Sequence, residues 1–303
     1  MKKENAISKY VNAHINNISF PKTIEQLEEF IYEETLTSYL DINFETDTAN
    51  PLYYTQTIKI DGQNPFNLEI PSGIKEVKKC EFVNCHDIKS LILPESVETI
   101  APFAFAYSSL ESINFNGTSN LKNIQNNAFA HCFYIKKLRL PKSVEIVDLQ
   151  AFYECKTLEH VSFENNNNLQ KLGQKVFYEC RALKSIFIGH NSQLTEMGSE
   201  CLYNCRSLTY FSFGNNSKIQ TIGASAFREC KPLKELYIPA TCQKIGDWCF
   251  SGCFQGSRGD PEDLVIYAEN TTRPAGWENN YNSSNNIVYW GVTYPTLPDD
   301  FSF

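Results

Sequence analysis

The stretch Leu158–Cys180, LEHVSFENNNNLQKLGQKVFYEC, indicates the fold of the chain, because its pattern of apolar residues recurs along most of the sequence. The phenylalanine position of that pattern is occupied in turn by Phe82, Phe105, Phe129, Phe152, Phe177, Leu202, Phe227 and Phe250. The steps between them are 23 to 25 residues long. A fixed period in this range is the signature of a stacked-repeat architecture, in which each coil packs only on its neighbours.

The small differences in step length have a local cause. Steps of 23 residues contain a tight turn at Pro94, Pro141 or Pro239. Each longer step carries a polar loop instead, such as ENNNN at residues 164–168. Insertions confined to one loop, with the apolar columns kept in register, are what a solenoid tolerates.

Each repeat has the same order of apolar positions. Two apolar residues at spacing two, such as Leu138 and Leu140, predict a short strand with both side chains directed inward. A second apolar pair at spacing three follows, and then a small residue, a Phe and, three residues later, a Cys. Phe152 and Cys155 at i and i+3 suit one helical turn that faces the core. We therefore expect strand, turn and short helical arc in every coil.

These columns resemble the BspA-like (Treponema-type) leucine-rich repeat. The resemblance rests on LILPESVETIAPFAF (91–105), LRLPKSVEIVDLQAFYEC (138–155) and LYIPATCQKIGDWCFSGC (236–253), and it covers about residues 68–253. It implies an α/β solenoid: a right-handed leucine-rich-repeat superhelix with a parallel sheet on its concave face and short helical arcs opposite. It also implies binding by that surface and an association with cell-surface adhesion, and it implies no catalytic residues.

The segments outside the repeat are expected to close its ends. Residues 1–60 are interpreted as a helical or mixed cap, with an amphipathic helix over 23–40, a shorter helix near 5–16 and a strand over 52–60. A cap is needed because the first coil otherwise exposes its apolar end, although a separate partner-binding module is the alternative. The repeat domain is predicted to span residues 61–266 in about eight to nine coils.

The C-terminal end is interpreted in the same way. A ninth strand is expected at Leu264 and Ile266, and residues 267–303 are expected to form a capping segment. Trp277 and Trp290 are the predicted plug over the last coil, with a ligand role as the alternative.

Composition restricts the function classes. With 303 residues, 42% of them hydrophobic, the chain can form a sizeable core. The net charge of −8 argues against nucleic acid and anionic membrane surfaces as partners. No run of 18 apolar residues occurs, so no membrane insertion is expected. The first residues lack the apolar core of a signal peptide, which favours a cytoplasmic location, whereas the family resemblance favours the cell surface or secretion.

Eleven cysteines suggest a disulfide or metal protein at first sight, but their positions favour packing. Seven share one repeat position: Cys85, Cys132, Cys155, Cys180, Cys205, Cys230 and Cys253. A buried thiol behaves as a small hydrophobe. Only Cys80 lies outside the core columns, so it is expected to react first. The pairs 201/205 and 249/253 have no His at ligand spacing, so neither a metal nor another cofactor is predicted.

No catalytic motif accompanies these residues. The five histidines form no H-E-x-x-H pattern, and the sequence contains neither a nucleophile elbow nor a phosphate-binding loop. The chain is therefore interpreted as a non-enzymatic interaction or adhesion-type protein. The alternatives are an intracellular scaffold that binds partners through its N-terminal segment and an enzyme with its activity in residues 1–60.

Outward residues of the strands locate a candidate ligand site. Six positions on successive coils form a basic edge followed by aromatic residues: Lys137, Arg139, His160, Phe187, Tyr210 and Tyr237. Exposed Tyr and Arg are favoured at binding hot spots. We expect this face to take an acidic or aromatic-stacking partner, either a protein segment or a glycan. The alternative is cross-strand aromatic packing that only stabilises the sheet.

Overall fold

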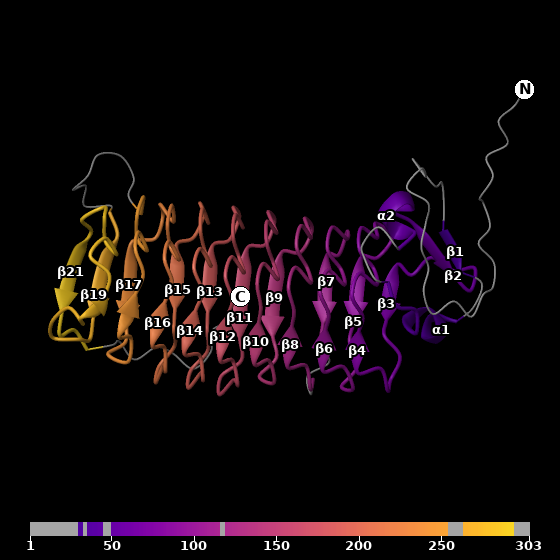
Figure 1. Ribbon diagram of the computed structural model, residues 1–303, viewed down its shortest axis with the longest axis horizontal. Helices are drawn as coiled ribbons and strands as arrows, with labels where there is room; N and C mark the ends of the chain where they lie inside the picture. Colours follow the sequence, from indigo (N-terminus) through magenta and orange to yellow (C-terminus); the bar gives the residue numbers. More distant parts are fainter. Residues whose placement is uncertain (1–29, 33–34, 45–49, 116–118, 254–262, 294–303) are drawn as a thin grey trace, which may run out of the picture.

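The computed structural model describes residues 30–32, 35–44, 50–115, 119–253 and 263–293. Within these ranges the chain forms a solenoid whose coils stack in one row along the long axis of the molecule (Figure 1). All paired strands run parallel. The predicted stacked-repeat architecture is therefore confirmed.

Each coil begins with a first strand. These strands form three consecutive sheets, ordered β3-β5-β7, β9-β11-β13-β15 and β17-β19-β21. Their bounds are β3 Asn67–Glu69, β5 Ser90–Ile92, β7 Ser112–Asn114, β9 Lys137–Leu140, β11 His160–Phe163, β13 Ser185–Phe187, β15 Tyr210–Ser212, β17 Glu235–Ile238, β19 Val265–Ala268 and β21 Ile287–Trp290. The predicted ninth strand at Leu264 and Ile266 corresponds to β19, which confirms it.

A second, two-residue strand follows in nearly every coil. These strands make one sheet of nine, ordered from β4 to β20. Their bounds are β4 Glu76–Val77, β6 Thr99–Ile100, β8 Asn123–Ile124, β10 Ile146–Val147, β12 Lys171–Leu172, β14 Glu196–Met197, β16 Thr221–Ile222, β18 Lys244–Ile245 and β20 Gly276–Trp277. Each buries its second residue, so the core lies between the two strand layers.

The Phe column forms the centre of this core. All eight of its members are fully buried. Consecutive rings from Phe82 to Phe177 stack with centroids 5.2–5.7 Å apart, until Leu202 interrupts the series. Aromatic pairs at this separation stabilise beyond the area that they bury. The predicted repeat register is confirmed.

The predicted short helical arcs are wrong. In the segment around Phe129, Asn127 and His131 have φ angles of 57° and 58°, so no right-handed helix runs through it. Corresponding left-handed residues flank the other members of the column. The cause is the stacking itself, because the Phe129 amide donates to the Ala151 carbonyl of the next coil, at 2.8 Å, and not to a residue four positions back.

The cysteine column packs in the core as predicted, and all eleven cysteines are buried. The expectation that Cys80 lies outside the core is wrong, because only 1% of its surface is accessible and it belongs to the same apolar cluster. The sequence interpretation missed a second role. The thiol of Cys155 donates to the Phe129 carbonyl of the preceding coil at 3.2 Å, and Cys180 bonds Phe152 in the same way. The column therefore joins successive coils by hydrogen bonds as well as by packing.

Thiol reactivity tests this assignment. Burial raises the pKa of Cys132 and Cys201 to about 12, so little of the reactive thiolate forms at neutral pH. We expect maleimide labelling of the intact protein to be slow at all eleven cysteines and complete only after denaturation. Mass spectrometry of the labelled, non-reduced protein measures this. Several disulfides, or a rapidly labelled column cysteine, would contradict the packing assignment.

The N-terminal end differs from the predicted helical cap. Instead of one helix over 23–40, β1 (Phe30–Tyr32) pairs in parallel with β2 (Ile58–Ile60), and α1 (Leu36–Leu40) is only five residues long. The backbone of β1 pairs with that of β2, and this pairing outweighs the helical spacing of apolar residues in the local sequence. The Thr35 hydroxyl caps α1 by accepting from the Ser38 amide at 3.3 Å.

The remaining N-terminal expectations divide between the described and undescribed parts of the chain. The strand expected over 52–60 is confirmed only at its end, where β2 lies. The beginning of this segment forms the short helix α2 (Leu52–Thr55). The predicted helix near 5–16 lies outside the described residues. We refer to the described residues of 30–60, which include β1, α1, α2 and β2, as the N-terminal unit. It packs on the first coil through Tyr39 and Asn50. Whether residues 1–60 form a cap or a separate module stays a prediction.

At the C-terminal end both strand layers continue beyond residue 266, as far as β20 and β21. Trp277 is buried and donates from Nε1 to the Cys242 carbonyl at 3.2 Å. Its ring lies 5.3 Å from that of Trp290 and 5.1 Å from that of Tyr281. The two tryptophans thus pack together over the core of the last coils.

Candidate functional site

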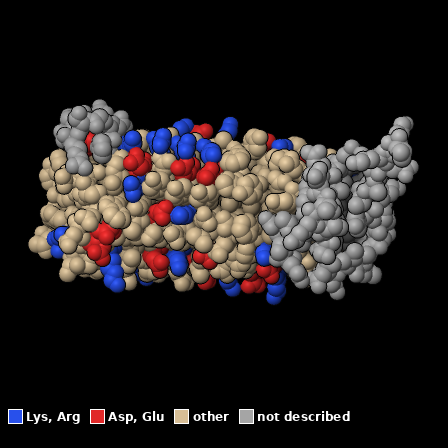
Figure 2. Space-filling view, turned by 45° about the horizontal axis from the view of Figure 1, so that its top comes forward, with Lys and Arg blue, Asp and Glu red and all other residues tan. Residues whose placement is uncertain are grey.

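Charge is mixed on the surface of the solenoid. Figure 2 shows basic and acidic side chains interspersed along the face in view. Several form ion pairs between neighbouring coils, including Lys171 with Glu196 and Lys175 with Glu200. Exposed pairs of this kind contribute little stability, on the order of 0–1 kcal/mol each. A partner that binds such a surface is therefore recognised by individual side chains more than by a uniformly positive or negative electrostatic potential.

The predicted site lies on the outward side of the first strands, which we call the first-strand face. The parallel register places Lys137, His160, Ser185 and Tyr210 in one row. Arg139 and Phe187 share a second row, with a serine between them. The structure therefore brings five of the six predicted residues onto adjacent strands, and Tyr237 lies on β17, next to β15.

The charged part of this face is less basic than the sequence suggests. Lys137 and Arg139 are exposed, as expected. His160 is half-buried, and its Nδ1 lies 2.7 Å from the Ser185 hydroxyl. Burial, with a smaller contribution from the charge of Lys137, lowers the pKa of His160, while Glu159 acts in the opposite direction. His160 is therefore mainly neutral at pH 7, and the cationic edge consists of Lys137 and Arg139.

The expectation that Phe187 is an exposed aromatic residue is wrong. Only 3% of its surface is accessible, and its ring packs edge-on against His190 with centroids 5.1 Å apart. Ser185 and Ser212, its neighbours on the same face, are also buried. A partner that approaches the structure as described cannot stack on Phe187. Tyr210, on the next strand, is half-buried.

A tyrosine row, of which the sequence predicted only the first member, Tyr237, continues the face toward the C-terminus. Tyr237, Tyr267 and Tyr289 stand in register on β17, β19 and β21. Their rings stack with centroid distances of 4.7 and 5.6 Å. Tyr289 is 51% exposed, and Ile287 beside it is 57% exposed. The sequence contains a pattern that indicates this row, because each tyrosine is the third residue of a four-residue strand.

The chemistry of this tyrosine row suits recognition. Burial raises the pKa of both Tyr237 and Tyr267, so their hydroxyls stay protonated at neutral pH and can donate hydrogen bonds. Neighbouring tyrosines hold one another in place by stacking, so a partner orders few rotamers on binding. The row therefore combines apolar area, donor groups and rigidity.

A second aromatic ladder lies along the turns of the Phe segments, which we call the turn edge. Its members are Tyr107, His131, Tyr153, Tyr178, Tyr203 and Arg228. Rings on adjacent coils are 4.4–5.3 Å apart, and the Arg228 guanidinium lies 5.7 Å from the Tyr203 ring. Sequence reasoning missed this ladder because it assigned the segments to helical arcs.

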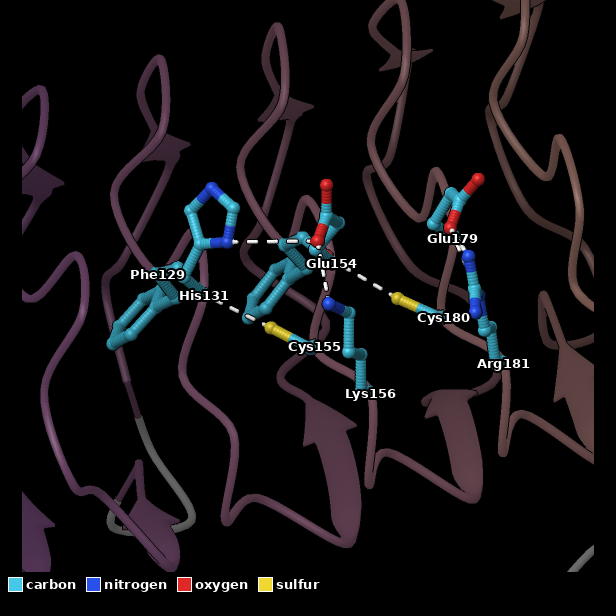
Figure 3. A network of polar contacts seen from close by, with 9 residues as sticks. Phe129, His131, Glu154, Cys155, Lys156, Glu179, Cys180 and Arg181 are labelled. Carbon is cyan, nitrogen blue, oxygen red and sulfur yellow. Dashed lines mark hydrogen bonds and ion pairs between the residues drawn. The ribbon is translucent and has the colours of Figure 1, made fainter.

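Charged groups are paired along the turn edge. Glu154 lies between His131, 3.9 Å away, and Lys156, 2.9 Å away (Figure 3). Burial acts to raise the pKa of Glu154, but the hydrogen bond and charge of Lys156, with His131, hold it below its usual value. Glu179 pairs with Arg181 in the next coil. These contacts neutralise the turn edge and favour a structural role there.

Pockets also lie elsewhere on the described surface. One, of about 460 Å³, is lined by Tyr53, Val83, Asn84, Phe103 and Tyr107 where the N-terminal unit meets the solenoid. Another, of about 480 Å³, is on the sheet of second strands and is lined by the polar residues Thr195, Lys218, Gln220, Thr221, Thr241, Gln243 and Lys244. The described lining residues of these pockets include no carboxylate and no histidine.

Two further searches concern the same described ranges. They contain no group of three or more His, Cys, Asp or Glu residues placed to hold a metal ion. They also contain no helix of the length and apolarity that crossing a bilayer requires. On the described surface, the first-strand face combines a tyrosine row with a cationic edge.

Comparisons with known proteins agree with this architecture. A family model described as the BspA type leucine rich repeat region matches residues 61–168 and 122–255, in six copies. The comparison with curated proteins found no match.

Solved structures of leucine-rich repeat proteins are similar to the chain. A leucine rich repeat protein of T. pallidum has 24% identity and a TM-score of 0.49, over 55% of this chain and 78% of that one. A leucine rich cell surface protein of Faecalibacterium prausnitzii has 19% identity and a TM-score of 0.39, over 76% and 70%. The pneumococcal vaccine antigen PcpA has 15% identity and a TM-score of 0.37, over 89% and 82%.

Proposed function

Since this chain belongs to the BspA-type leucine-rich repeat family, we propose that it acts by binding a protein partner through its first-strand face. Leucine-rich repeat proteins of this type generally bind other proteins and lack catalytic activity, so binding is the expected class of function. A repeated scaffold suits it, because stacked coils present an extended row of side chains at nearly constant spacing. Fold alone does not identify the partner, and the argument for a site rests on particular side chains.

The tyrosine row Tyr237–Tyr267–Tyr289 is the observation that carries the proposal. Tyrosine is favoured at binding hot spots because it adds contact area and a hydrogen bond at low entropic cost. Lys137 and Arg139 form a cationic edge farther along the same face, with His160 and Tyr210 between them and the row. An extended protein segment with aromatic and acidic residues complements both ends. Phe187 is part of the floor of this surface and not a contact residue.

A triple substitution tests the proposal. Tyr237→Ser, Tyr267→Ser and Tyr289→Ser together remove the row, and we expect partner capture to fall by about tenfold or more, since losing even one moderate hot spot has that effect. Quantitative pull-down from cells that produce the protein, with circular dichroism to verify folding, measures this. Unchanged capture would place the site elsewhere.

The turn edge provides a matched control. Tyr153→Ser, Tyr178→Ser and Tyr203→Ser also remove three stacked, half-buried tyrosines from adjacent coils. This variant should retain the partners that the first variant loses. A chain that lacks residues 1–60 tests the alternative that the protein is a scaffold which binds partners through its N-terminal segment. Partners that are lost only from this truncated chain would favour that alternative. Capture of glycans on an array is the corresponding test for a carbohydrate partner.

A further inference from the structure

One position of the repeat is occupied by a carboxyl group in the first coil alone. The residue before the Phe column is small or apolar in the following coils, where it is Ala104, Ala128, Ala151, Val176, Cys201, Ala226 or Cys249. All of these are fully buried. In the first coil the same position is Glu81, and its accessible surface is also 0%. Glu81 thus places an ionisable side chain at a buried repeat position that small or apolar side chains occupy in the following coils.

The carboxyl group of Glu81 has little compensation in the described structure, because the charge and the amide of Lys78 favour its ionised form less than burial opposes it. Neither Oε1 nor Oε2 has a hydrogen-bond partner within normal geometry among the described residues. Burying a polar group without a hydrogen bond costs about 1–3 kcal/mol, and an unpaired charge costs more. The neutral, protonated form is therefore the one that this position tolerates.

The main chain at Glu81 is, by contrast, the point where the N-terminal unit attaches. The Tyr39 hydroxyl donates to the Glu81 carbonyl at 2.8 Å. The side-chain amide of Asn50 donates to the same carbonyl at 2.9 Å and to the Cys80 carbonyl at 2.7 Å. The Tyr39 ring also packs against Phe82, with centroids 5.5 Å apart. The N-terminal unit therefore binds the main chain of the residue whose carboxyl group is buried, and Asp41 of this unit acts on that carboxyl group through its charge.

We propose that Glu81 makes the attachment of the N-terminal unit depend on pH, so that the unit is held while the carboxyl group is neutral and loosens when it ionises. The charged groups that face it are few. Lys78, on the same coil, favours the ionised form through its charge and its amide, whereas Asp41, at the end of α1, opposes it. Burial outweighs both and raises the pKa of Glu81 well above its usual value.

The direction of the effect follows from linkage. Because the pKa of Glu81 is higher in the attached state than in the detached one, the attached state binds more protons between the two values. Attachment is fully stabilised below the pKa of a solvated carboxyl group, about 4.3. The stabilisation is lost as pH rises from there to the raised pKa. Loosening uncovers the first coil, whose strands β3 and β4 are the terminal strands of their sheets.

Hydrogen exchange in the full chain tests the proposal. The protection factors of amides in 36–42 and 52–60 are measured by mass spectrometry between pH 5 and 9 and corrected for intrinsic exchange. We expect protection to fall with rising pH, by up to about tenfold per unit in the linkage range, and amides of β11 and β13 to show no such trend. A flat profile in the N-terminal unit would overturn the proposal.

Three variants make the test specific. Glu81→Gln keeps the size of the side chain but cannot ionise, and Glu81→Ala installs the residue that other coils hold at this position. Both should abolish the pH trend, and the alanine variant guards against misfolding caused by a buried amide. Glu111→Gln, which removes an exposed carboxyl group near β7, should retain the trend. A trend that persists in both Glu81 variants would show that another group is responsible.

Discussion

Phe152→Ala is expected to lower the free energy of unfolding by about 3–5 kcal/mol, the largest loss that we predict for any single substitution. Phe152 is fully buried and stacks between Phe129 and Phe177, at centroid distances of 5.2 and 5.7 Å. Truncation removes contacts with both neighbouring coils and leaves a cavity that the strand layers on either side prevent from collapsing. The loss therefore includes a transfer contribution and a cavity contribution.

Urea denaturation followed by circular dichroism and by intrinsic fluorescence measures this loss. Two probes are needed because repeat arrays can lose cooperativity when one coil is weakened. Glu111→Ala, at an exposed position, is the control and should change the free energy of unfolding by less than about 0.5 kcal/mol. If Phe152→Ala behaved like this control, the repeat register would be incorrect.

The second large effect is expected at Gly198. It follows β14, and a Cβ atom added there would lie 2.5 Å from the main-chain nitrogen of Gln174 and 2.5 Å from the carbonyl carbon of Gly173. These are backbone atoms of the preceding coil, and they cannot move without disturbing both strand layers. Gly198→Ala should therefore destabilise the protein by about 1–3 kcal/mol or more, as overpacking does.

The same repeat position supplies the control for Gly198. Earlier coils hold Ala101, Gln125 and Asp148 there, so a Cβ atom is already accommodated. Gln125→Ala should leave the denaturation midpoint nearly unchanged, whereas Gly198→Ala should lower it clearly. Equal midpoints for the two variants would mean that the close approach of the coils at Gly173 and Gly198 relaxes without cost.

The repeat, its register and the identity of the core columns could be predicted from the amino-acid sequence. Those features are set by burial, and burial repeats with the period of the chain. The columns of Leu138, Phe152 and Cys155 recur in nearly every coil, so one alignment of the chain with itself identifies them. The inward direction of alternate strand residues follows from the two-residue period of a strand. For these reasons the core could be derived without a structure.

The backbone path around the Phe column could not be predicted from the sequence, because it depends on contacts between coils. Spacing of i and i+3 between Phe and Cys is compatible with a helical turn and with the observed turns alike. The choice depends on where the amide groups find acceptors, and the Phe129 amide finds the Ala151 carbonyl of the next coil. The same reason explains β1, whose ladder with β2 replaces the expected helix. Long-range hydrogen bonds of this kind leave no periodic signal in the sequence.

The candidate site shows the same division. Sequence reasoning identified which side of the first strands faces outward, and it placed Lys137, Arg139 and Tyr237 correctly on that side. It could not distinguish the buried Phe187 from the exposed Tyr289, because both alternate with core residues in the same way. Exposure on an outward face depends on what neighbouring coils and loops place over each residue. That information is three-dimensional, since the groups that cover a strand come from other parts of the chain.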